Sequence, residues 1–187
     1  MSSESERRWR VLASDYVVET PYLRLRRDRI ELPNGVRVDD YFVRESRGFS
    51  VIFATTTDDR VVLVRQYKHG AATRVLELPA GAIDEGETAL GCAERELAEE
   101  TGFVVAPPGL EHVATLFTDP TNSDGRLFLF AGRDARRERA PTPDPTEEIA
   151  VELARFSELR RYAADGTIEV AAHVAAIYLM LDRLGRL

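Results

Sequence analysis

The sequence predicts an α+β protein in which antiparallel strands come first and helices follow. Two observations lead to this prediction. Residues 22–32 and 36–44 alternate in polarity around the turn-forming sequence Pro33-Asn34-Gly35, which indicates a β-hairpin. Residues 88–102 begin with a threonine that can cap a helix, continue with apolar residues three and four apart, and end in glycine, which indicates an amphipathic helix over about residues 89–101.

The remaining elements follow from the same two periodicities. Apolar or alternating runs predict strands at residues 49–55, 60–67, 75–78, 111–117, 126–131 and 148–156. Helical spacing predicts two further helices, over residues 157–164 and 169–184. Turn-forming residues predict loops at 80–87 and 118–125, and a polar surface loop at 133–145 that contains three prolines.

Length and composition are typical of one enzyme domain. The chain has 187 residues, of which 44% are hydrophobic and 30% charged, enough to form a core without disulfides. We expect a flexible terminus at residues 1–12 and a single domain over 13–187, with its N-terminal strands within 13–48. A net charge of −7 disfavours nonspecific binding of nucleic acid, and no apolar run reaches the length of a membrane span. The expected location is therefore the cytoplasm, with neither nucleic acid nor membrane as a partner.

The segment from Gly81 to Phe103 carries the chemical signal. On a helix, Glu96, Glu99 and Glu100 lie at positions i, i+3 and i+4, so three carboxylates share one face. Like charges at this spacing repel, and a hard divalent cation between their oxygens would relieve the repulsion. The alternative reading is a solvated glutamate-rich helix.

The other polar residues near this face are expected to support it. Arg95 lies four residues before Glu99, so its guanidinium can orient the carboxylates. Cys92 is the only cysteine and is expected to be a buried thiol. The three histidines have no spacing typical of a zinc site.

This segment resembles the Nudix box, in which glycine, five residues, glutamate, seven residues and Arg-Glu precede an aliphatic residue, a Glu-Glu pair and a final glycine. Every defined position is met between Gly81 and Phe103. The resemblance implies the Nudix fold, an α/β/α sandwich with a mixed central sheet, and hydrolysis of a nucleoside diphosphate linked to another moiety. It further implies Mg²⁺, with Mn²⁺ as the alternative. The ligands it implies are Glu96, Glu99, Glu100 and the carbonyl of Ala80, with Glu87 and Arg95 as supports.

Three flanking segments are similar to the ADP-ribose pyrophosphatase group of that superfamily: YFVR at 41–44, VLVRQYK at 62–68 and LELPAG at 76–81. This similarity implies cleavage of ADP-ribose to AMP and ribose 5-phosphate. It also implies a homodimer that exchanges its N-terminal sheet, and contacts to substrate from Arg44, Arg65 and Lys68. Three alternatives stay open: a nucleotide-sugar pyrophosphatase of the GDP-mannose type, a non-catalytic nucleotide sensor, and a monomer in which residues 22–44 form an edge hairpin.

The chain departs from the group in one loop. Members commonly carry a glutamate there as a metal ligand or general base, whereas residues 118–125 read TDPTNSDG. Asp124 or Asp119 could take that role, or the base could be a box glutamate such as Glu96 or Glu99. Asp124 could instead stabilise a turn with Gly125.

Overall fold

The computed structural model describes residues 8–187, and these divide into two compact units. The N-terminal unit comprises the described residues up to Arg47 together with Phe117–Arg126, and the box unit comprises Gly48–Leu116 and Leu127–Leu187. The single domain expected over residues 13–187 stays a prediction, since compact units are not in themselves domains. Of the expected flexible terminus, residues 1–7 lie outside the described part, and residues 10–12 already belong to the first strand.

The N-terminal unit is an antiparallel sheet of three strands in sequence order, β1 (Arg10–Glu19), β2 (Arg24–Glu31) and β3 (Arg37–Glu45). The predicted hairpin is β2–β3, and Gly35 has the positive φ of 83° that its turn requires. Strand β1 was not predicted, because it lacks a regular alternation of apolar and polar residues. The segment Phe117–Arg126 is attached to β3 through a hydrogen bond from the N–H of Arg44 to the carbonyl of Asn122, at 2.8 Å.

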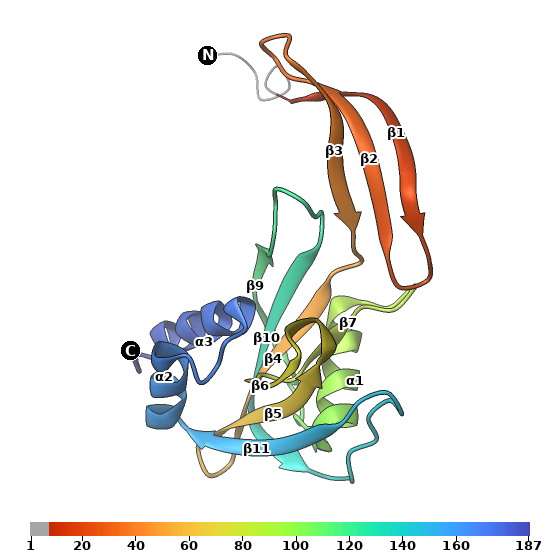
Figure 1. Cartoon of the computed structure of the whole chain (residues 1–187). Helices are drawn as coiled ribbons and strands as arrows, with labels where there is room; N and C mark the ends of the chain where they lie inside the picture. Colours follow the sequence, from red (N-terminus) through yellow and green to blue (C-terminus); the bar gives the residue numbers. More distant parts are fainter. Residues whose placement is uncertain (1–7) are drawn as a thin grey trace. The chain divides into compact units, whose positions relative to one another are not determined.

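The box unit contains a mixed sheet with the strand order β11-β5-β4-β10-β8, of which Figure 1 labels all but β8. Strands β4 and β10 are parallel, whereas β4–β5 and β5–β11 are antiparallel. β6 pairs with β5, β7 with β4 and β9 with β10. The strand bounds are β4 (Phe49–Thr56), β5 (Arg60–Lys68), β6 (Thr73–Glu77), β7 (Ala80–Ala82), β8 (Phe103–Val104), β9 (Glu111–Phe117), β10 (Arg126–Arg137) and β11 (Ile149–Arg155).

Helices cover both faces of this sheet, α1 (Ala89–Thr101) on one face and α2 (Phe156–Asp165) and α3 (Ala171–Arg183) on the other (Figure 1). The alternation along β4 explains this arrangement. Ile52 belongs to the buried cluster that includes Leu97 of α1, whereas its neighbour Phe53 belongs to the cluster that includes Ile177 of α3. Adjacent residues of β4 thus face opposite sides of the sheet and supply an apolar layer on each side. This arrangement confirms the predicted α+β class and the sandwich that the family resemblance implied.

Two sequence predictions were wrong in the box unit. Strand β10 continues to Arg137 into the segment expected to be a loop, because Arg136 and Arg137 pair with the unpredicted strand β8. Residues 80–82 form β7 beside β4 rather than a loop. The end of β10 carries exposed arginines, so its sequence does not indicate a strand, and the pairing with a distant strand stabilises it.

No helix in the described part is long and apolar enough to cross a membrane.

Candidate functional site

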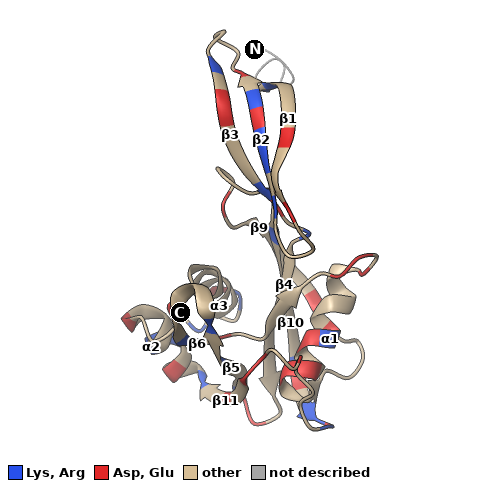
Figure 2. Ribbon diagram, turned by 45° about the vertical axis from the view of Figure 1, so that its right-hand side comes forward, with Lys and Arg blue, Asp and Glu red and all other residues tan. Residues whose placement is uncertain are grey.

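The site is built on α1, whose ends are set by local sequence. The side chain of Thr88 accepts a hydrogen bond from the N–H of Gly91 at 3.0 Å, and Gly102 ends the helix with φ of 74°. The helix therefore spans the residues that the sequence predicted. Figure 2 shows the acidic residues that lie along this helix and in the loop before it.

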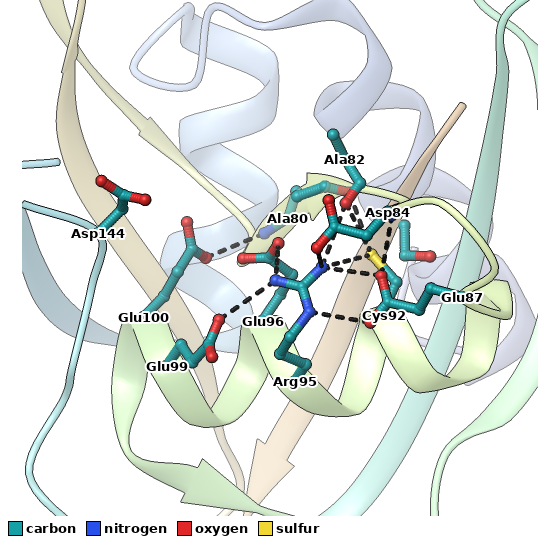
Figure 3. Close-up of polar contacts among 12 residues, drawn as sticks. Ala80, Ala82, Asp84, Glu87, Cys92, Arg95, Glu96, Glu99, Glu100 and Asp144 are labelled. Carbon is teal, nitrogen blue, oxygen red and sulfur yellow. Dashed lines mark hydrogen bonds and ion pairs between the residues drawn. The ribbon is translucent and has the colours of Figure 1, made fainter. Parts of the chain in front are cut away.

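Arg95 lies at the centre of the acidic residues of this helix. Its guanidinium forms a two-pronged pair with Glu87, at 2.8 and 2.9 Å, and its other nitrogen donates to Glu96 at 2.6 Å and Glu99 at 3.2 Å (Figure 3). The pairing with Arg95 lowers the pKa of Glu87 to about 2. The supporting geometry that the sequence predicted for Glu87 and Arg95 is thus present.

Glu100 is the buried carboxylate of the set, with only 1% of its surface exposed. Its Oε2 accepts a hydrogen bond from the N–H of Ala80 at 3.0 Å, so it lies beside the carbonyl that the family resemblance implies as a ligand (Figure 3). The pKa of Glu100 is raised to about 8, chiefly by burial, which outweighs the lowering effect of the hydrogen bond from Ala80; the negative charges of Glu96 and Glu147 contribute to the rise. Burial also raises the pKa of Glu96, against the effect of Arg95.

These residues fit a hard divalent cation. All the donors are oxygens, the kind that Mg²⁺ and Mn²⁺ prefer, and Glu100 is held in an environment where its negative charge is under-compensated. Arg95 forms ion pairs with Glu96 and Glu99. Within residues 8–187, no group of three or more Asp, Glu, His or Cys side chains is already arranged to hold a metal ion. A bound cation would therefore draw at least one of these carboxylates toward Glu100.

The side chain of Glu96 closely approaches the backbone at Gly81. A Cβ atom at position 81 would lie 1.9 Å from Oε1 of Glu96, far inside van der Waals contact. Behind this loop the buried thiol of Cys92 faces the carbonyl oxygens of Gly81 and Ala82, at 3.3 and 3.4 Å. The first glycine of the motif thus makes room for a carboxylate.

Sequence reasoning missed Glu147. Its negative charge contributes to raising the pKa of both Glu96 and Glu100. The loop that carries it is tied to the end of α1, because the N–H of Thr142 donates to the carbonyl of Glu99 at 2.8 Å. The available signal was the Glu147-Glu148 pair at the start of a predicted strand.

The other predicted site residues have different surroundings. Lys68 forms an ion pair with Glu77 at 3.1 Å and acts electrostatically on Glu100, so it belongs near the box carboxylates. Arg65 pairs with Glu152 at 2.6 Å on the adjacent strand.

Arg44 and Asp124 both belong to the N-terminal unit. There the carboxylate of Asp124 accepts a hydrogen bond at 2.8 Å from the N–H of Ser46, a residue distant in sequence. Its predicted role as ligand or base stays a prediction.

Without metal, the protein should become less stable as pH rises from about 6.5 to 8.5. The folded state keeps a proton on Glu100 up to about pH 8, whereas the unfolded chain loses it near 4.5, so raising the pH favours unfolding. His173, whose pKa burial lowers from 6.5 to about 4, has the opposite effect, but only below about pH 6.5. Urea unfolding in EDTA should show the decline, and Glu100→Gln should flatten it; an equal slope in both proteins would contradict the assignment.

Comparisons with known proteins agree with this geometry. A model of the NUDIX domain matches residues 44–174, and a model of the nucleoside diphosphate sugar hydrolase N-terminal domain matches residues 9–43. The chain is 28% identical to the methanol dehydrogenase activator of Bacillus methanolicus, over 92% of this chain and 93% of that protein. It is 32% identical to an ADP-ribose pyrophosphatase of Mycobacterium tuberculosis, over 79% and 76%. A crystal structure of an ADP compounds hydrolase superposes with a TM-score of 0.82 at 24% identity, covering 99% of this chain and 100% of that one.

Proposed function

The chain belongs to the NUDIX domain family, and on that premise we propose that it cleaves ADP-ribose to AMP and ribose 5-phosphate. The observation that carries the proposal is the buried carboxylate Glu100 beside Ala80, with Glu96, Glu99 and Glu147 in the same site. Relatives named ADP-ribose pyrophosphatase support the choice of substrate. The expected location is the cytoplasm.

The proposed metal ligands are Glu96, Glu99, Glu100 and the carbonyl of Ala80. Mg²⁺, or Mn²⁺ in its place, would supply charge neutralisation at the phosphates and a more acidic water when bound. Arg95 keeps the carboxylates oriented through its contacts with Glu87, Glu96 and Glu99.

The proposed base is Glu147, which lies on a separate loop, contributes negative charge at Glu100 and accepts a hydrogen bond from the N–H of Asp144 at 3.2 Å. A carboxylate so placed can accept the proton of an attacking water.

We assign Lys68, Arg65 and Arg44 to the anionic parts of the substrate. Lys68 is the best supported of the three, since its ammonium group acts on Glu100 and is held by Glu77. The Arg65 guanidinium keeps donors beyond the 2.6 Å contact of its Nε with Glu152, so a phosphate could share it. Arg44 is exposed on β3.

A homodimer is the proposed assembly. Burying exposed apolar side chains in an interface between two copies would be favourable. The N-terminal unit exposes a set of large ones: Trp9, Val11, Tyr16, Val17, Tyr22, Leu23, Val36 and Phe42. Light scattering of the purified chain should return twice the 21.0 kDa chain mass. A mass of one chain at micromolar concentration would contradict this assembly.

The activity is tested by incubating metal-free protein with ADP-ribose and GDP-mannose, with and without Mg²⁺ or Mn²⁺, and separating the products by chromatography. We expect AMP and ribose 5-phosphate from ADP-ribose only when metal is added. Preference for GDP-mannose would favour the nucleotide-sugar alternative. Calorimetric binding of ADP-ribose without turnover at any metal concentration would favour a non-catalytic sensor.

A further inference from the structure

A ring of buried polar side chains lies behind the carboxylate site, and the proposed chemistry does not use it. Its members are Gln66 on β5, Glu77 on β6 and His173 on α3, which are 4%, 3% and 4% exposed. Buried polar groups are costly unless they are paired, so the pairing of these three is informative.

His173 is held as a single tautomer by its two contacts. Its Nδ1 accepts a hydrogen bond from the N–H of Leu78 at 3.1 Å, so the ring proton is on Nε2. Nε2 lies 3.4 Å from Oε2 of Glu77 and can donate to it. Helix α3 thereby fixes both the backbone of Leu78 and the carboxylate of Glu77.

The other oxygen of Glu77 faces the site. Its Oε1 receives the amide nitrogen of Gln66 at 2.9 Å and the ammonium group of Lys68 at 3.1 Å. The same amide nitrogen lies 3.5 Å from Oε1 of Glu100. Because Glu77 accepts only, it dictates that the nitrogen of the amide, and not its oxygen, faces Glu100.

The contacts close into a ring. Glu100 accepts the N–H of Ala80 through its second oxygen, and Ala80 is two residues from Leu78 in the chain. Between them the carbonyl of Pro79 is held by the N–H of Ile52 at 2.9 Å. Glu100 is therefore positioned from both sides, by backbone through Ala80 and by side chains through Gln66.

We propose that Glu77, held by His173, is a positioning residue that acts through the Gln66 amide to fix the metal-binding carboxylate of Glu100. The proposal rests on the proposed metal site. Groups that orient metal ligands from behind typically contribute about 10–100-fold to metal affinity. With a Gln side chain at position 77, the Gln66 amide would be free to turn its oxygen toward Glu100, where it would repel that carboxylate.

The test is the dissociation constant for Mn²⁺, measured on the full chain by the electron paramagnetic resonance signal of the free ion. Glu77→Gln and Gln66→Met should each weaken Mn²⁺ binding roughly 10-fold. If Glu77→Gln does not fold, as judged by thermal unfolding, Gln66→Met alone decides. Wild-type affinity in the folded variants would overturn the proposal.

Two variants of His173 separate positioning from simple anchoring. His173→Gln places an amide nitrogen near Nε2 and can still donate to Glu77, whereas His173→Asn keeps an acceptor for the N–H of Leu78 and loses that donor. We expect Mn²⁺ affinity close to wild type in His173→Gln and a roughly 10-fold loss in His173→Asn. A larger loss of Mn²⁺ affinity in His173→Gln than in His173→Asn would mean that only the hydrogen bond from the N–H of Leu78 matters, and would overturn the role of Glu77.

A double substitution distinguishes failure of this proposal from failure of the proposed function. If Glu77 acts through Glu100, Glu77→Gln should have no further effect on Mn²⁺ affinity in a Glu100→Gln background. An additional roughly 10-fold loss there would overturn the proposal while leaving the metal site intact. If wild type and Glu100→Gln bind Mn²⁺ equally, the proposed metal site itself is wrong.

Discussion

Glu96→Gln and Glu100→Gln should each lower the turnover of ADP-ribose at least ~100-fold at saturating Mg²⁺. Each change removes a negative charge from the buried site while keeping side-chain volume. In Glu100→Gln the amide oxygen can still accept the N–H of Ala80, so the substitution tests the charge rather than that hydrogen bond. Turnover measured by AMP release, with thermal unfolding in parallel, checks this expectation.

Glu94→Gln is the matched control, because Glu94 is on the same helix and is exposed to solvent. It removes the same charge from α1 and should leave turnover within about twofold, as expected for a surface position away from the site. Near wild-type turnover in Glu96→Gln or Glu100→Gln would remove those residues from the proposed ligand set. A large loss in Glu94→Gln would instead show that the total charge of the helix matters more than the buried positions.

The fold could be predicted where short-range sequence determines structure. Thr88 and Gly102 are within one turn of the ends of α1, so the bounds of that helix follow from capping alone. The β2–β3 hairpin likewise follows from a turn that ends in Gly35. Strand β8 and the end of β10 could not be predicted, because each is a strand only through pairing with the other, more than 30 residues away in the sequence.

The same distinction holds for the site. Arg95, Glu96, Glu99 and Glu100 lie within two turns of one helix, so helical periodicity was enough to place them together. Glu77 and His173 meet only because β6 and α3 pack together, across 96 residues of sequence. No rule of sequence spacing indicates such a contact, and a lone histidine in an apolar helix is usually interpreted as an ordinary core residue.

Glu147 is a candidate that the family resemblance did not bring to attention. The missing glutamate was sought at residues 118–125, where Asp124 was the nearest substitute. In the structure Asp124 accepts a backbone N–H from Ser46, whereas the charge of Glu147 acts on both Glu96 and Glu100. The sequence indicated that a glutamate was lacking from residues 118–125, and only the folded chain brings Glu147 forward as a second candidate beside Asp124.

Glu147→Gln and Asp124→Asn should therefore have opposite outcomes. We expect Glu147→Gln to lower kcat at least ~100-fold, since removing a general base typically costs that much or more. Asp124→Asn should leave kcat within about threefold, because an amide oxygen can still accept the N–H of Ser46. Both changes keep size and remove one charge from an exposed loop residue, so a nonspecific electrostatic effect would act on both alike.

The pH dependence of kcat separates the possible roles of Glu147. If Glu147 accepts the proton of water, Glu147→Gln should abolish the acidic limb of the pH–rate profile; if it only binds metal, raising Mg²⁺ should restore most of the rate. Restoration by metal would move the base role to a box glutamate such as Glu99, whose carboxylate is the most exposed of the three on α1 at 40%. A large loss of kcat in Asp124→Asn together with wild-type kcat in Glu147→Gln would return the role to Asp124, and the N-terminal unit would then contribute directly to catalysis.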